Sequence, residues 1–129
     1  MHVRQLISSQ SPLEPIIGFS RACRMGNWIC VAGTAPIGSD GQSFGLNDVY
    51  LQTRRCLEIS AQAIAEAGGK LENVIRTRIM LTDISRWREA AKAHGEYFAA
   101  IKPACTFVEV KGFIRPEWLV ETEVDCAID

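Results

Sequence analysis

The chain has 129 residues, a length that suits one domain able to bury roughly two-thirds of its unfolded surface. Its apolar fraction of 47%, charged fraction of 22% and net charge of −1 are typical of a globular protein without the basic surface that nucleic acid requires. No cationic segment leads into a long apolar run near the N-terminus, and no window approaches the roughly 18 apolar residues of a membrane span. We therefore expect a single cytoplasmic domain over residues 1–129, with neither nucleic acid nor a membrane as partner.

The cysteines argue against a disulfide framework and against a metal site. There are five of them, with no C-x-x-C spacing and no Cys/His cluster: Cys23, Cys30, Cys56, Cys105 and Cys126. Disulfide frameworks usually hold an even number of cysteines, and zinc sites usually show short paired spacings. The pattern favours reduced thiols that act as small apolar residues, and no bound metal.

The first part of the chain predicts three strands and a long loop. Residues 3–8 form a short extended run, and residues 21–25 and 28–32 form two more, joined at Gly26-Asn27 in the manner of a hairpin. The following segment, 33–45, contains four glycines and a proline and predicts a loop. Its glycines match neither a P-loop nor a dinucleotide-binding motif, so a plain mobile loop that can line a pocket is favoured.

Two helices follow from spacings of three and four residues between apolar positions. Asn47 or Asp48 can cap the first helix, which should run to Ala67 and end at Gly68-Gly69. Its inner stripe is predicted to contain Val49, Thr53, Cys56, Leu57, Ser60, Ala63, Ile64 and Ala67. The second helix is predicted over residues 86–100, with an inner stripe of Trp87, Ala90, Ala91, His94, Phe98 and Ile101.

Three further strands are predicted over residues 74–82, 102–112 and 118–128, which makes the order β-β-β-α-β-α-β-β. In the first of them we expect Ile75, Thr77, Ile79 and Leu81 on one face, and Val74, Arg76, Arg78 and Met80 on the other. This is an α+β pattern of one sheet with two helices covering one face. In the last strand the acidic residues Glu121, Glu123 and Asp125 should point away from the helices, as should Arg76 and Arg78. Such a charged, helix-free face favours an assembly surface.

Three side chains invite a chemical interpretation. Glu121 could orient a water or accept a proton if burial adjusts its pKa; the alternative is a structural ion pair with Arg76 or Arg78. His94, on an inner helical stripe, is expected to be a hydrogen-bonded core residue rather than a base. Cys105 has no His nearby in sequence, and Glu109 on the same strand face would raise its pKa, so a nucleophilic role is disfavoured.

Three separated motifs in the same order resemble the RidA/YjgF family, also labelled L-PSP endoribonuclease-like, over essentially the whole chain. They are "IGFSRACRMGNWICVAGTAP", "QTRRCLEISAQAIAEAGGKLENVIRTRIMLTDI" and "KPACTFVEVKGF" with "LVETEVDCAI". The resemblance implies a chorismate-mutase-like α+β fold and a homotrimer whose three sheets form a central barrel, with ligand clefts between subunits. Typical members hydrolyse enamines and imines such as 2-aminoacrylate to 2-keto acids and ammonia, and need no cofactor.

The resemblance also implies site residues. Glu121 matches the glutamate that helps to place the hydrolytic water, and Gly33 matches a loop position whose backbone faces the ligand. The arginine that grips the substrate carboxylate falls at Cys105, and a tyrosine falls at Phe19. At two more positions where family members have polar residues, a serine and an asparagine, this chain has Ala32 and Ala91. On this basis the cleft residues are expected to be Phe19, Gly33, Cys105, Thr106 and Phe107, with Glu121 as the catalytic group.

Because this chain lacks the family's polar residues at these four positions, two functional hypotheses stay open. The first is an enamine/imine deaminase acting on an atypical small-molecule substrate, less acidic than the family's usual one. The second is a non-catalytic small-molecule-binding or chaperone-like protein that kept the scaffold. Arg78 and Arg115 are candidates to replace the missing charge. A ribonuclease is disfavoured by the slightly negative charge and by the absence of a His pair for acid–base cleavage.

Overall fold

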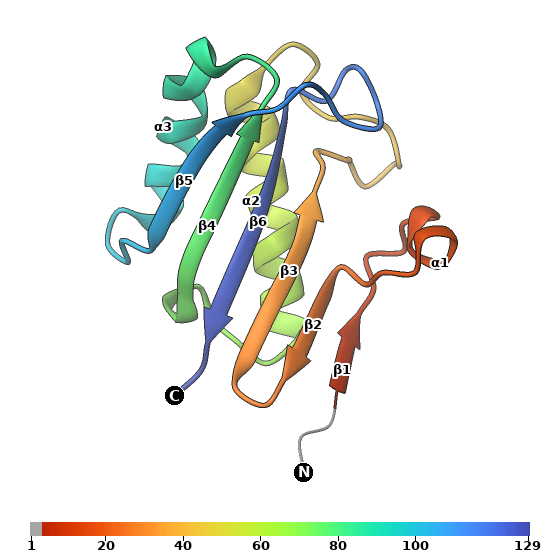
Figure 1. Cartoon of the computed structure of the whole chain (residues 1–129), viewed down its shortest axis with the longest axis vertical. Coiled ribbons are helices and arrows are strands. Elements are labelled where there is room, and N and C mark those ends of the chain that lie inside the picture. The colour runs from red at the N-terminus through yellow and green to blue at the C-terminus, as the bar shows by residue number, and fades with distance from the viewer. Residues whose placement is uncertain (1–3) are drawn as a thin grey trace.

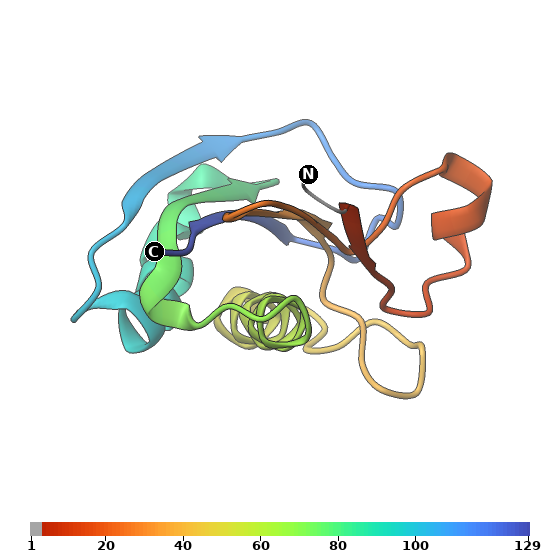
Figure 2. The same cartoon turned by 90° about the horizontal axis from the view of Figure 1, so that it is seen from below.

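One mixed sheet with both long helices on one face organises the molecule, as Figures 1 and 2 show for the computed structural model, which describes residues 4–129. The strands are β1 (Arg4–Ile7), β2 (Ala22–Met25), β3 (Trp28–Thr34), β4 (Val74–Leu81), β5 (Ala104–Glu109) and β6 (Val120–Ala127). The helices are α1 (Leu13–Ile17), α2 (Val49–Glu66) and α3 (Trp87–Phe98), with 3₁₀ turns at Leu71–Asn73 and Ile84–Arg86. The strand order is β1-β2-β3-β6-β4-β5, and only β4 and β5 are parallel.

The predicted α+β fold and element order are confirmed, with additions. The hairpin between β2 and β3 turns at Gly26, whose φ of 60° lies in the region that favours glycine at the first turn position. The short helix α1 and the two 3₁₀ turns were not predicted, because runs of three to five residues show no helical periodicity. Val3, the first residue of the predicted N-terminal strand, lies outside the described residues.

Helix α2 has the stripe that the sequence predicts. The Asp48 side chain accepts a hydrogen bond from the backbone nitrogen of Leu51, which caps the helix, and Gly68 follows its end with a φ of 89°. All eight predicted inner positions are buried. For α3 the predicted stripe is partly wrong. Trp87, the first residue of α3, is 42% exposed beneath the Arg88 guanidinium, whereas Ala93 is fully buried.

Strand β4 departs from the predicted alternation at its beginning. Val74 is buried and Ile75 is 42% exposed, the reverse of the expected faces. The reason is an irregularity in pairing with β6 between Val74 and Arg76, which shifts the register by one residue and so exchanges the two faces. From Thr77 to the end of the strand the predicted alternation holds, with Thr77, Ile79 and Leu81 buried.

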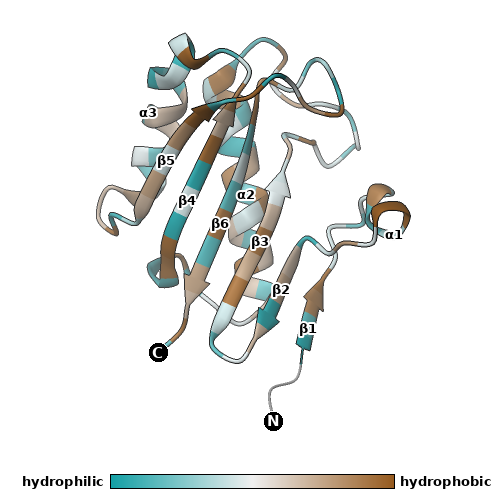
Figure 3. Ribbon diagram, in the orientation of Figure 1, coloured by the Kyte–Doolittle hydropathy of each residue, from teal (hydrophilic) through white to brown (hydrophobic). Residues whose placement is uncertain are grey.

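Strand β6, between β3 and β4, separates the core from an open face. Its residues alternate between buried and half-buried along its whole length, as predicted. Val120, Val124 and Cys126 face the helices, while Glu121, Glu123 and Asp125 lie on the helix-free side. Figure 3 shows the resulting alternation of hydrophilic and hydrophobic residues along β4 and β6. On the open side Arg78 forms an ion pair with Glu123, one of the pairings expected for this face.

The five cysteines are unbonded, and their environments differ. Cys56 and Cys126 are buried as small apolar residues, whereas Cys30 and Cys105 are exposed. His94 is the hydrogen-bonded residue that was expected, with its Nε2 atom 2.8 Å from the Thr77 hydroxyl and its ring packed near Phe98. Within residues 4–129, no helix combines the length and apolar character needed to cross a membrane.

Gln52 joins two loops to helix α2. Its side chain is fully buried, and its Nε2 atom donates to the carbonyl oxygens of Gly45 (3.2 Å) and Glu117 (3.1 Å). Its Oε1 atom accepts from the backbone nitrogen of Leu119 at 2.8 Å. One side chain therefore holds the end of the glycine-rich loop and the segment that enters β6 in a common position.

Replacing Gln52 by Leu should lower the free energy of unfolding by about 2–4 kcal/mol, because three buried backbone groups would lose their partner. Urea denaturation of the variant and the wild type measures this. Gln62→Leu is the matched control, since Gln62 is exposed and its amide donates a hydrogen bond only to the Glu66 side chain among residues 4–129. Equal stability of the two variants would show that the Gln52 hydrogen bonds contribute no net stabilisation.

Candidate functional site

A β-bulge in β3 places a glycine beside the carboxylate of Glu121. Val31 pairs with Val124 and Thr34 pairs with Thr122, so two residues of β3 lie opposite one residue of β6. The second of the two is Gly33. A Cβ atom at this position would lie 3.2 Å from Oε1 of Glu121, a distance tighter than ordinary van der Waals contact. The glycine therefore leaves the room that the carboxylate occupies.

The Glu121 carboxylate is half-buried and lacks a direct partner in the part of the chain that the structure describes. Burial raises its pKa above the ordinary value; the Arg21 guanidinium lowers that pKa and the Glu123 carboxylate raises it. Among residues 4–129, no side chain forms an ion pair or hydrogen bond with it. The alternative of an ion pair with Arg78 is thus not observed, since Arg78 pairs with Glu123. A carboxylate in this state is suited to accept a proton or orient a water.

Arg21 forms hydrogen bonds with the residues of the bulge. The sequence did not indicate this role. It is 8% exposed, and its Nη1 atom donates to the Gly33 carbonyl oxygen (2.8 Å) and the Thr34 hydroxyl (3.2 Å). Its Nε atom donates to the Ser9 hydroxyl, which in turn donates to the Glu14 carboxylate at 2.6 Å. Burial lowers the pKa of Arg21, while the charges of Glu14 and Glu121 raise it. This guanidinium is the charge that balances the Glu121 carboxylate without touching it.

The bulge opens into a cavity of about 860 Å³. Its walls come from the α1 region, the end of β3, the glycine-rich loop, one side of α2 and the segment before β6. Phe19, Gly33 and Glu121 line it, so three of the predicted site residues meet here. Arg115 and Trp118 line it from the segment before β6.

The remaining predicted residues do not meet this cavity within one chain. Cys105, Thr106 and Phe107 lie on β5, at the edge of the sheet, and strands β6 and β4 separate β5 from β3. Cys105 is exposed and pairs in register with Thr77, whereas Phe107 packs against the helix-side core. A neighbouring copy would have to supply these three residues to any cleft that contains Glu121.

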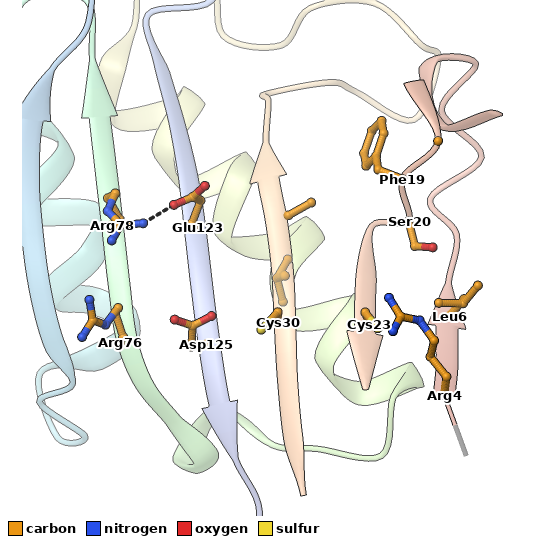
Figure 4. A pocket seen from close by; sticks show the side chains of 13 residues that line it. Arg4, Leu6, Phe19, Ser20, Cys23, Cys30, Arg76, Arg78, Glu123 and Asp125 are labelled. Atoms are coloured by element: carbon orange, nitrogen blue, oxygen red, sulfur yellow. Dashed lines mark hydrogen bonds and ion pairs between the residues drawn. The ribbon is translucent and has the colours of Figure 1, made fainter. Parts of the chain in front are cut away.

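A second hollow of about 550 Å³ lies on the open face of the sheet, shown in Figure 4. Arg76, Arg78, Glu123 and Asp125 form one side of it, and their charges are of both signs. Cys30 also lines it, and burial together with the Asp125 carboxylate raises the pKa of that thiol, which disfavours a nucleophilic role. Across residues 4–129, no three His, Cys, Asp or Glu side chains are grouped to hold a metal ion.

A mixed sheet with helices on one face, and with a carboxylate at a bulge beside a cavity, defines an α+β domain with a small-molecule-sized pocket. The profile of the family described as "Endoribonuclease L-PSP" matches residues 9–128, and the chain belongs to this family, the RidA/YjgF family that its motifs resemble. The predicted family is confirmed.

Individual relatives span nearly the whole chain. A solved structure of a YjgF/YER057c/UK114 family member from Mycobacterium tuberculosis is 41% identical, covers 98% of this chain and 100% of its own, and superposes with a TM-score of 0.89. An uncharacterized protein from Streptomyces coelicolor is 38% identical over 92% of this chain and 88% of its own length. The 3-aminoacrylate deaminase RutC of Acinetobacter baylyi is 27% identical over 92% of this chain and 93% of its own.

Replacing Glu121 by Gln should stabilise the protein at about pH 8 and have little effect at about pH 4. The ordinary pKa of a glutamate is 4.5, and burial raises it in the folded state. Between the two pKa values the folded state holds more protons than the unfolded state, so wild-type stability falls as pH rises through this window. Thermal melts across this pH range measure the difference.

Glu72→Gln, on the exposed 3₁₀ turn at Leu71–Asn73, is the control and should show no such pH dependence. A Glu121→Gln variant that melts below the wild type at about pH 8 would mean that the carboxylate stabilises the fold, contrary to the burial argument.

Proposed function

We propose that the protein is a RidA-like hydrolase that converts an enamine or imine to a carbonyl compound and ammonia. The observation that carries this proposal is the Glu121 carboxylate, which lies beside Gly33, has a raised pKa and has no direct partner among residues 4–129. The deaminase name of the Acinetobacter baylyi relative supports the same reaction class.

The reaction needs one group that moves a proton in both directions. Water adds to the carbon of the protonated C=N bond while Glu121 accepts one of its protons, and a neutral carbinolamine forms. Glu121 then returns this proton to nitrogen, the C–N bond breaks, and ammonia leaves as the C=O bond forms and Glu121 takes up the proton of the carbinolamine hydroxyl. An enamine first takes a proton on carbon and becomes the imine. A carboxylate with a raised pKa serves both steps better than an ordinary glutamate, because it holds a proton closer to neutral pH.

The complete cleft is proposed to lie between subunits of a homotrimer. The Glu121 cavity is one half, and the exposed edge strand β5 of a neighbouring copy, with Cys105, Thr106 and Phe107, is the other. The helix-free face, on which Arg76, Arg78, Glu123 and Asp125 carry charges of both signs, suits contact between copies of the same chain.

Ammonia release from enzymatically generated 2-aminoacrylate and 3-aminoacrylate tests the reaction. The wild type should exceed the spontaneous rate on at least one member of a wider imine panel, and Glu121→Gln should reduce that excess about 100-fold or more, the usual contribution of general acid–base catalysis. The Glu72→Gln variant should match the wild type. A wild type that binds small molecules but hydrolyses none of them would instead support the alternative of a non-catalytic binding or chaperone-like protein.

A Cys105→Arg variant tests whether position 105 belongs to the cleft. A guanidinium there should accelerate hydrolysis of 2-aminoacrylate by about 10- to 100-fold, since a charged hydrogen bond contributes about 1.5–3 kcal/mol. Cys105→Ser is the control, because it changes the thiol without adding charge. If the two variants have equal rates while both remain trimeric by light scattering, position 105 lies outside the cleft.

A further inference from the structure

We propose that Arg21 and Glu14 are positioning residues for the hydrolysis, joined through Ser9 into a buried chain of charges that decides at which pH Glu121 is ionised. This inference rests on the proposed function for the chemistry at Glu121. It gives the segment before β2, which no site motif contains as far as Glu14, a part in the reaction although it does not touch the reacting carboxylate.

One end of this chain lies at helix α1. Glu14 is 7% exposed, and its Oε2 atom accepts from the Ser9 hydroxyl at 2.6 Å and from the Ser9 backbone nitrogen at 3.0 Å. The same hydroxyl accepts from the Nε atom of Arg21 at 3.1 Å. Because a hydroxyl has one proton, the serine that donates to Glu14 is an acceptor toward Arg21. The order Glu14, Ser9, Arg21 is therefore fixed by hydrogen bonding.

The other end of the chain lies at the bulge of β3. The Nη1 atom of Arg21 donates to the Gly33 carbonyl oxygen at 2.8 Å, and the Glu121 carboxylate lies against the same glycine. Among residues 4–129, the guanidinium and the carboxylate form neither a hydrogen bond nor an ion pair with each other. Arg21 thus acts on Glu121 through its charge, and the contacts at both ends of its planar guanidinium hold that charge in place.

The charges that face Glu121 come from three elements. Burial raises the pKa of Glu121, the Arg21 charge lowers it, and the Glu123 charge on β6 raises it. From α2, the Cys56 thiol stays neutral, because burial and the Glu121 charge raise its pKa well above the usual value. In the described part of the chain, Arg21 is therefore the cation that opposes the burial of Glu121. The other charged side chains that line the cavity are Arg55, Glu58, Glu66 and Arg115.

The alternation of charge predicts opposite effects for its two outer steps. Without the Arg21 charge, two buried carboxylates remain with no cation between them, so Glu121 should ionise at higher pH. Without the Glu14 charge, Arg21 acts on Glu121 alone, so Glu121 should ionise at lower pH. One oxygen of Glu14 accepts from Ser9 and from the Ser11 backbone nitrogen, and the amide oxygen in Glu14→Gln can accept the same bonds. This variant therefore removes charge and retains geometry.

A carbon-13 titration of the Glu121 carboxyl group tests the proposal without requiring turnover. The protein is labelled at its glutamates, and the Glu121 signal is the one that disappears in Glu121→Gln. Its midpoint should rise by about one pH unit in Arg21→Gln and fall by about half a pH unit or more in Glu14→Gln. Arg21→Lys, which keeps the charge, should stay closer to the wild type than Arg21→Gln.

The pH dependence of kcat/KM should follow the titration. Glu121 must be ionised to accept a proton from water, so kcat/KM falls at low pH, and the pH of this fall should move with the midpoint. Arg21→Gln should then lose about tenfold more activity at low pH than at about pH 8. An equal loss at every pH, with the midpoint unmoved, would show a structural role alone and would overturn the proposal.

Arg24→Gln is the matched control. Arg24 lies on β2 and also holds backbone carbonyl oxygens, those of Gly26 (2.9 Å) and Ala67 (2.8 Å), but it lines neither cavity. This variant should titrate as the wild type does, and thermal melts show which variants are folded. If Arg21→Gln does not fold, Glu14→Gln decides, and a midpoint that does not fall would overturn the proposal. Midpoints that move in the same direction in both variants would do so too.

The two proposals fail separately in this design. Opposite shifts of the Glu121 midpoint, together with no ammonia release from any imine, would uphold the chain of charges and overturn the hydrolase. Hydrolysis that depends on Glu121, together with one midpoint in all variants, would uphold the hydrolase and overturn the roles of Arg21 and Glu14.

Discussion

Strand β6 must serve two different environments at once, and the rest of the structure depends on this constraint. Its apolar residues close the core beneath α2, and its acidic residues are left on a face that no helix covers. Because side chains alternate along a strand, neither set can move without displacing the other. Glu121 is the acidic residue nearest the end of β3, so the packing of Val120 and Thr122 on the buried side determines where the carboxylate points.

The site contains two buried charged groups, and interactions with the surrounding fold offset the free-energy cost of burying them. Burial opposes the charge on Glu121, and the Arg21 guanidinium reduces that penalty from a distance. Arg21 is itself buried, and it is held by the Gly33 carbonyl oxygen and by the Ser9–Glu14 pair. This arrangement leaves the carboxylate oxygens free for a ligand or a water, which a direct ion pair would prevent. Perturbed groups that remain available to solvent are typical of functional sites.

Local patterns predicted most elements because each pattern has a direct local cause. The α2 stripe, the Asp48 cap and the alternation of β6 follow from residue spacing alone, and all three are present. The predicted side-chain faces were wrong where the chain departs from regular strand or helix geometry. A bulge beside Val74 exchanged two faces of β4, and the start of α3 left Trp87 at the surface. Bulges depend on how two distant strands pair, and spacing within one strand does not reveal that pairing.

The sequence by itself determined the family and the α+β order of elements, and it named Glu121 and Gly33 as candidate site residues, because motifs and hydrophobic periodicity are properties of neighbouring residues. Only the tertiary structure decided which charges share the cavity. Arg21 and Arg115, 100 and 6 positions from Glu121 in the chain, meet it there, whereas Cys105 lies on the far edge strand. The strand order and the hydrogen bonds of Gln52 decide which residues lie at the cavity, and both come from contacts between residues remote in sequence.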